Sequence, residues 1–294
     1  VLVYLNFVLG KVLGTPLDWR FPNEAWQYAQ ADWNRKRTRL LALGVVLNVV
    51  LLLGFKYVSP GLAFLGFDGL VTGPVASWVM PLGLSFFTFE CIAYLVDVYR
   101  GSPASDQQLE FATYKLYFQK LISGPITRFH SFSGQLKEIK FPPLSQYVEG
   151  LWLIAAGAVK KLMLADNIGQ LVDLSAESLT RAGSGDIWLL AFAYGLQLYF
   201  DFSGYVDVAR GSALLLGITL PQNFNFPYFS RSIADFWRRW HMTLGDWLRN
   251  YLYFPLGGSR SSLVRTCINL IVVMLIAGVW HGDRWGFIGA SLSL

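Results

Sequence analysis

The chain has 294 residues, of which 54% are hydrophobic and only 15% are charged, against about a quarter charged residues in typical soluble domains. This composition argues against an ordinary soluble enzyme, because too few polar residues are present to cover a water-exposed surface. The formal net charge is +5, but the basic residues fall in short clusters beside apolar runs. That arrangement is typical of membrane proteins and argues against nucleic acid as a partner.

The first predicted elements are apolar helices. Residues 1–14 already have the composition of a hydrophobic helix. The clearest membrane span covers residues 40–58, which form an apolar run long enough to cross the hydrocarbon core. A second span is predicted over residues 76–99, where Pro81 and Gly83 can bend the helix.

The next elements are less regular. Residues 109–127 are only moderately apolar and are interrupted by Gly-Pro-Ile at 124–126, which favours a helix that dips partway into the membrane. A third span is predicted over residues 147–165. Residues 187–218 are too long for one simple crossing, so we expect one crossing together with a dipping or kinked stretch. The last clear span covers residues 263–282.

Charge predicts which side of the membrane each connecting segment occupies. Basic residues outnumber acidic ones in residues 100–146 and 221–265, whereas residues 166–186 are mainly acidic. By the positive-inside rule, the two basic segments lie in the cytoplasm and the acidic segment lies outside. The pattern therefore predicts an all-α polytopic transmembrane bundle with re-entrant and interfacial helices. Because apolar runs reach both ends, we expect residues 1–294 to be one membrane-embedded domain, truncated at both ends from a longer protein.

One segment is neither a span nor an ordinary loop. Residues 221–260 are rich in Trp, Tyr, Phe and Arg, and the apolar members recur at helical spacing. An amphipathic helix in the membrane interface would explain that stripe and the arginines. It would not explain His241, which lies among the aromatic residues, or the Asn and Pro residues that precede the helix. We expect residues 221–260 to form short helices that lie in or beneath the membrane on its cytoplasmic side.

The chain contains three histidines. His281 follows a long apolar run, and an ionisable side chain near membrane depth is a functional candidate because it is costly to keep there. An imidazole can act as a general base near neutral pH. A hydrogen-bonded structural histidine is the alternative, and both interpretations remain open at this point. His130, in a polar stretch, is predicted to be an ordinary surface residue.

Other polar groups give weaker signals. Asp201 and Asp207 are six positions apart and would face different ways on a regular helix, so we expect helix packing or cavity lining more than an ion relay. Cys91 and Cys267 lie in apolar runs and form no metal or redox motif. The sequence has no nucleophile-elbow, Walker or zinc-protease motif.

Four motifs together resemble a known family. They are FQKLISGPITRF at 118–129, DFSGYVDVARGSALLLGI at 201–218, the segment from PQNFNF to PLGG at 221–258, and VWHG at 279–282. The chain resembles the membrane-bound O-acyltransferases (MBOAT) over about residues 35–287, and is most similar to the alginate O-acetyltransferase branch. Relatives of that branch transfer D-alanine to teichoic acids or acetyl groups to peptidoglycan. The resemblance implies a ring of tilted helices around a funnel that thins the membrane.

The resemblance also implies a site. His241 in RWHM and His281 in WHG match the family's motifs, and the second is the main catalytic candidate. Both suit one reaction, so we expect them to lie close enough to serve one cavity. Asp283 and Arg284 depart from the small residues that relatives more often have after WHG. The residues expected to contact substrate are Trp237, Arg238, Arg239, Trp240 and Asn250.

The implied function is O-acyl transfer in the bacterial cytoplasmic (inner) membrane by a multi-pass protein. The donor would be a cytoplasmic acyl-thioester such as acetyl-CoA, and no bound cofactor or metal is expected. The acceptor would be a hydroxyl of an exopolysaccharide such as alginate, reached directly or through an extracytoplasmic partner protein, with membrane lipid around the chain. Two alternatives are a transporter or lipid flippase, for which we find no paired repeats, and a non-catalytic scaffold of a polysaccharide complex.

Overall fold

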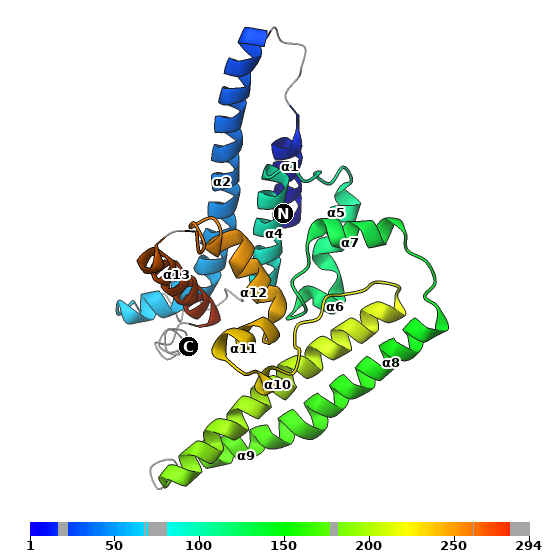
Figure 1. The fold of residues 1–294 in the computed structure, drawn as a ribbon, viewed down its shortest axis with the longest axis vertical. Coiled ribbons are helices and arrows are strands. Elements are labelled where there is room, and N and C mark those ends of the chain that lie inside the picture. The colour runs from blue at the N-terminus through cyan, green and yellow to red at the C-terminus, as the bar shows by residue number, and fades with distance from the viewer. Residues whose placement is uncertain (17–22, 68, 70–80, 177–181, 261, 283–294) are drawn as a thin grey trace. The chain divides into compact units, whose positions relative to one another are not determined.

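The computed structural model describes residues 1–16, 23–67, 69, 81–176, 182–260 and 262–282. These residues are mainly helical and contain no strand, which confirms the predicted all-α class (Figure 1). The chain divides into two compact units. Unit 1 comprises Val1–Tyr117, Arg128–Ser133 and Leu244–Leu294, and unit 2 comprises Phe118–Thr127 and Gly134–Thr243.

The N-terminal part of unit 1 consists of α1 (Leu2–Gly14), α2 (Asn23–Phe64) and α4 (Leu84–Tyr99), which pack against one another (Figure 1). Asn6 of α1 and Asn48 of α2 are both buried and exchange amide hydrogen bonds of 3.3 and 2.8 Å. Side-chain amides that pair in this way satisfy each other inside an apolar helix bundle. The helices predicted at residues 1–14 and 40–58 are confirmed.

Helix α4 begins later than predicted. Gly83 precedes its first turn with φ +70°, a left-handed conformation that glycine adopts without steric cost. The backbone therefore changes direction at Gly83, and the helix starts at Leu84 instead of running through a bend. Residues 76–80 of the predicted span lie outside the described residues.

The helix predicted over residues 109–127 is interrupted, as expected. Helix α5 (Gln108–Leu116) is followed by the single turn α6 (Phe118–Leu121), and the backbone is then irregular until α7 (Phe129–Lys137). The interruption includes Gly-Pro-Ile at 124–126. This is expected because Pro125 has no backbone N–H to donate to a helical hydrogen bond. The depth of this stretch in the membrane stays a prediction.

Unit 2 is built around two long antiparallel helical segments (Figure 1). The first runs without a break through α8 (Leu144–Ala158), the π-helical η1 (Val159–Ala165) and α9 (Asp166–Ala176). The second is α10 (Ser184–Leu215), which is one helix of 32 residues. The predicted dipping or kinked stretch within 187–218 is therefore wrong. At ~1.5 Å per residue α10 is about 48 Å long, so one unbroken helix takes up almost all of the apolar stretch.

Glycines and ion pairs join these two segments. A Cβ atom at Gly157 would lie 2.5 Å from the carbonyl oxygen of Gly204, so only a residue without a side chain fits there. Lys160 lies 2.5 Å from Asp207, and Lys161 lies 2.7 Å from Asp201. The interpretation of the two aspartates as helix-packing groups is confirmed.

Residues 221–260 form short helices, as predicted. They are η3 (Pro227–Phe229), α11 (Ile233–Arg239), α12 (Met242–Leu248) and η4 (Arg249–Tyr253). Helix α13 (Leu263–His281) follows and confirms the helix predicted at 263–282. The cytoplasmic, interfacial location of the short helices stays a prediction.

Two helices of the described residues are long and apolar enough to cross a membrane. They are Tyr28–Phe64 and Leu263–His281. Both coincide with predicted spans. The other predicted crossings remain predictions.

Candidate active site

The polar stretch before α11 lies along the junction between α11 and α12. The Asn225 amide donates a 2.9 Å hydrogen bond to the carbonyl of Arg239, and the Met242 amide donates one of 2.9 Å to the carbonyl of Asn223. These two backbone bonds run in opposite directions and fix the stretch beside the junction. The Asn and Pro residues that an amphipathic helix left unexplained therefore shape the place where His241 lies.

Trp240 and His241 are the two residues between α11 and α12, and His241 has the unusual backbone. It has φ +42°, which is uncommon for a residue with a side chain, and it is only 5% exposed. Strained backbone of this kind concentrates at functional sites because surrounding contacts must hold it. This left-handed residue lies at the boundary between the two helices, and its imidazole is buried.

Aromatic and amide groups surround the imidazole of His241. Its ring meets the ring of Phe202 edge-on, with centroids 4.9 Å apart and planes at 83°. Its Nδ1 lies 3.1 Å from Oδ1 of Asn223. The same Oδ1 accepts hydrogen bonds from the backbone amide and the hydroxyl of Thr243, at 3.1 and 3.0 Å.

His281 is the last residue of α13 and belongs to unit 1. Its Nδ1 lies 2.7 Å from the carbonyl oxygen of Ala277, one turn earlier. A carbonyl can only accept, so Nδ1 carries the proton and Nε2 of the neutral ring carries the lone pair. The side chain is exposed, and its ring centroid lies 4.5 Å from that of Trp280. An exposed imidazole with a basic Nε2 is suited to accept a proton from a substrate hydroxyl.

Side chains of α2 form hydrogen bonds with the C-terminal end of α13. Lys56 Nζ donates to the carbonyl of Trp280, and the Tyr57 hydroxyl donates to the carbonyl of Gly282 at 3.0 Å. The last carbonyls of a helix have no intrahelical partner, so these bonds satisfy groups that would otherwise need water. They also limit the movement of His281.

The predicted substrate-contacting residues Arg238, Arg239 and Trp240, at and just after the end of α11, have different environments. Trp240 packs among rings of unit 2, including a 16° stacked contact with Phe236 at 5.6 Å. Arg239 forms a 3.0 Å salt bridge with Asp235, and this hydrogen bond lowers the pKa of the Asp235 carboxyl. Arg238 is exposed.

Trp237 and Asn250, the other two residues predicted to contact substrate, also have different environments. Trp237 packs against the ring of Phe236, with centroids 5.4 Å apart, and its indole nitrogen is buried without a hydrogen-bond partner among the described residues. Asn250 lies in unit 1, where its amide donates a 2.7 Å bond to the carbonyl of Asp246. Substrate contact stays a prediction for all of these residues, and Trp240 and Arg239 already have structural roles.

His130 is not the ordinary surface residue that was predicted. It is half-buried in α7, and its Nε2 is buried without a hydrogen-bond partner in the described part of the chain. Burial lowers the pKa of this imidazole, opposed in part by the charge of Asp97. The correction has a simple reason: the neighbouring Phe129 belongs to the aromatic core of unit 1, where its ring lies 5.1 Å from that of Tyr94.

Sequence reasoning missed the immediate surroundings of His241. Phe202 was seen only as part of a motif, and Asn223 and Thr243 were not singled out. The one available signal was the unexplained asparagine-rich stretch before α11. His241 belongs to unit 2 and His281 to unit 1. The expectation that both serve one cavity therefore stays a prediction.

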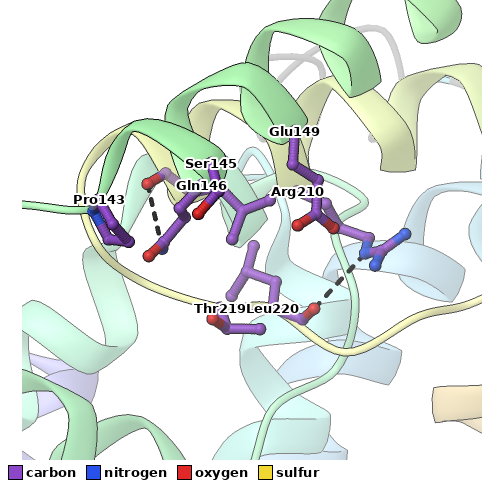
Figure 2. Close-up of a pocket in the computed structure, with 8 residues that line it drawn as sticks. Pro143, Ser145, Gln146, Glu149, Arg210, Thr219 and Leu220 are labelled. Carbon is purple, nitrogen blue, oxygen red and sulfur yellow. Dashed lines mark hydrogen bonds between the residues drawn. The ribbon is translucent and has the colours of Figure 1, made fainter.

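Unit 2 also contains a pocket of about 330 Å³ at the start of α8 and the end of α10 (Figure 2). Arg210 donates a 3.5 Å hydrogen bond to the carbonyl of Leu220, and Gln146 donates one of 3.3 Å to that of Leu214. Glu149 also lines the pocket, whereas neither candidate histidine does. Among the described residues no group of three or more His, Cys, Asp or Glu side chains could hold a metal ion.

Comparison with known proteins gives a consistent result. Residues 84–291, which include both candidate histidines, match the family model of the membrane-bound O-acyltransferases. The chain is 42% identical over 255 residues to the probable alginate O-acetylase of Azotobacter vinelandii, covering 85% of this chain and 51% of that protein.

Two further relatives are named for other transfer reactions. The chain is 35% identical over 290 residues to the peptidoglycan O-acetyltransferase of Helicobacter pylori, covering 88% of this chain and 54% of the relative. It is 30% identical over 224 residues to the teichoic acid D-alanyltransferase of Streptococcus thermophilus, covering 72% and 54%. The chain spans about half the length of these relatives.

Proposed function

Because this chain belongs to the membrane-bound O-acyltransferase family, we propose that it is an O-acyltransferase that moves an acetyl group onto hydroxyls of an exopolysaccharide such as alginate. The observation that carries the proposal is the family match over residues 84–291, which contains His241 and His281 in the family's motifs. The alginate acceptor is supported by 42% identity to a probable alginate O-acetylase.

We also propose the direction of transfer. The donor is an acyl-thioester such as acetyl-CoA, which reaches the protein from the cytoplasm. The acceptor hydroxyl lies outside, either on the polysaccharide or on a partner protein that relays the group. The protein is a multi-pass bundle of the bacterial inner membrane. The support for this orientation is the excess of arginine in residues 221–265 and of acidic residues in 166–186.

The chemistry needs one base and one or more donors. The acceptor oxygen attacks the thioester carbonyl while an imidazole Nε2 takes the hydroxyl proton. The tetrahedral intermediate then expels the thiolate, which receives a proton, so that an ester and a free thiol are formed. His281 is suited to be the base because its Nδ1–H is already engaged by Ala277. Hydrogen-bond donors would stabilise the oxyanion, and His241 is the second imidazole available to orient or donate.

The test is thiol release coupled to ester formation. Membranes that contain the protein would receive acetyl-CoA with and without the isolated polysaccharide, and free thiol and polysaccharide-bound acetyl would be measured together. We expect both products to rise in equal amounts when the acceptor is present. Movement of acetyl-CoA or polysaccharide across the membrane without ester formation would instead support the transporter alternative.

A further inference from the structure

The side chain of Asn223 is completely buried, with 0% of its surface exposed. Its Oδ1 accepts hydrogen bonds from the backbone amide and hydroxyl of Thr243 and lies 3.1 Å from Nδ1 of His241. One amide oxygen thus connects the polar stretch that precedes η3 with the histidine at the α11–α12 junction. All of these atoms belong to unit 2.

The hydrogen bonds of the Asn223 side chain show which end of its amide is the oxygen. The backbone N–H of Thr243 can only donate, so the atom that it meets at 3.1 Å must be the acceptor, Oδ1. The hydroxyl of Thr243 is itself held, since it accepts a 3.1 Å hydrogen bond from the amide of Ile126. Thr243 therefore clamps the amide of Asn223 in one orientation.

The fixed position of Oδ1 determines which ring nitrogen of His241 carries the proton. Because Oδ1 can only accept, the neutral imidazole must carry its proton on Nδ1 and its lone pair on Nε2. We propose that Asn223 is a positioning residue that holds His241 in this tautomer, so that Nε2 is the nitrogen that accepts or returns the proton. This inference rests on the proposed acyltransferase function for its consequence, but the tautomer itself can be observed without activity.

Two further observations support a positioning role over simple packing. The Nδ2 of Asn223 is buried without a hydrogen-bond partner among the described residues, which is a cost that an apolar residue would avoid. His281 reaches the same tautomer through the backbone carbonyl of Ala277. The two histidines therefore present the same nitrogen by different means. The tautomer of His281 is held by a backbone carbonyl, whereas that of His241 is held by a side chain that mutation can remove.

The direct test is the ¹⁵N spectrum of histidine-labelled protein in lipid nanodiscs, recorded at alkaline pH so that the rings are neutral. The signals of His241 are assigned by their loss in His241→Gln. We expect the wild type to show a proton on Nδ1 only, and Asn223→Leu to show a mixture of tautomers. Asn223→Asp retains an acceptor and should restore the single tautomer. A proton on Nε2 in the wild type would overturn the inference even if Asn223→Leu failed to fold.

Activity supplies the second readout. Asn223→Leu should lower kcat by about 10–100-fold per folded molecule with little change in KM for the thioester, as for other residues that orient a working histidine. Asn225→Leu is the matched control, because Asn225 is exposed and, within the described part of the chain, is bonded through its backbone amide and not through its side chain. It should retain both the tautomer and kcat.

The outcomes separate two failures. If the wild type shows the expected tautomer but transfers no acyl group to any hydroxyl, the proposed function fails and the positioning of His241 stands. If the wild type transfers acyl groups but Asn223→Leu keeps the same tautomer and kcat, the positioning role is refuted while the proposed function stands.

Discussion

At the residue scale, His281 provides the sharpest prediction. His281→Ala should reduce acyl transfer by about 10²–10⁴-fold, the usual contribution of a general base. The substitution adds no charge to the membrane, so the protein should remain folded and inserted. His241→Ala should also lower activity, by less if its role is to orient or donate. The measurement is polysaccharide acetylation in cells, normalised to folded protein in the membrane.

A structural role for His281 predicts a different result. Loss of the hydrogen bond to Ala277 would lower the melting temperature, and activity would fall only in step with the amount of folded protein. Near-normal acetylation by His281→Ala would remove the catalytic assignment and favour the scaffold interpretation.

His130 predicts a pH dependence of stability. Burial lowers the pKa of this imidazole in the folded protein from its ordinary value of 6.5. Below about pH 6.5 the unfolded chain therefore binds more protons than the folded chain at this position, so stability falls as the pH falls. We expect the melting temperature in detergent to drop less between pH 7.5 and pH 5.5, roughly one pH unit either side of that value, in His130→Gln than in the wild type. Equal drops in the two proteins would contradict this account of His130.

At the element scale, the contact of α8 with α10 depends on small residues. Gly157→Ala would place a Cβ atom 2.5 Å from the backbone oxygen of Gly204, which cannot move aside as a side chain could. Overpacking of this kind typically costs about 1–3 kcal/mol. We expect a lower melting temperature and easier proteolysis of the loop around residues 182–183.

Helix α10, which packs against α8, offers a control substitution. A Cβ atom at Gly185 of α10 would meet nothing within 4 Å. Gly185→Ala should leave stability unchanged or raise it slightly, since alanine is the better helix former. If both substitutions lowered the melting temperature equally, close packing between α8 and α10 would not be the cause.

At the scale of the whole molecule, the sequence predicts an orientation. Helix α10 is one unbroken helix, so we predict that it makes the single crossing that the charge pattern requires between the acidic loop and the arginine-rich segment. In a background with Cys267→Ser, a membrane-impermeant maleimide added to spheroplasts should label Ser184→Cys. Ser259→Cys should react only after the membrane is opened.

Both positions are exposed in the structure, so the difference in labelling reports sidedness and not burial. The remaining Cys91 is buried and should stay silent. Labelling of Ser259→Cys in intact spheroplasts would refute the cytoplasmic location of residues 221–260.

Local features of the chain were enough to predict the membrane class, the positions of most helices and the presence of His241 and His281 in two motifs. Long apolar runs can only be helical where no water is available to satisfy the backbone, so hydropathy identified residues 40–58 and 263–282. Local chemistry also marked the interruption at Gly-Pro-Ile. These features depend on neighbours in the chain, and a sequence displays such neighbours directly.

Other features follow from contacts between residues that are distant in the chain. Gly83 starts α4 where a bend was expected, α10 is unbroken, and His130 is half-buried beside an aromatic core. The contact of Asn223 with His241 joins residues 18 positions apart. Such outcomes depend on which side chains meet through space and which polar groups find partners when buried. Composition and spacing show which residues are available, whereas packing alone fixes their partners and the nitrogen that each histidine presents.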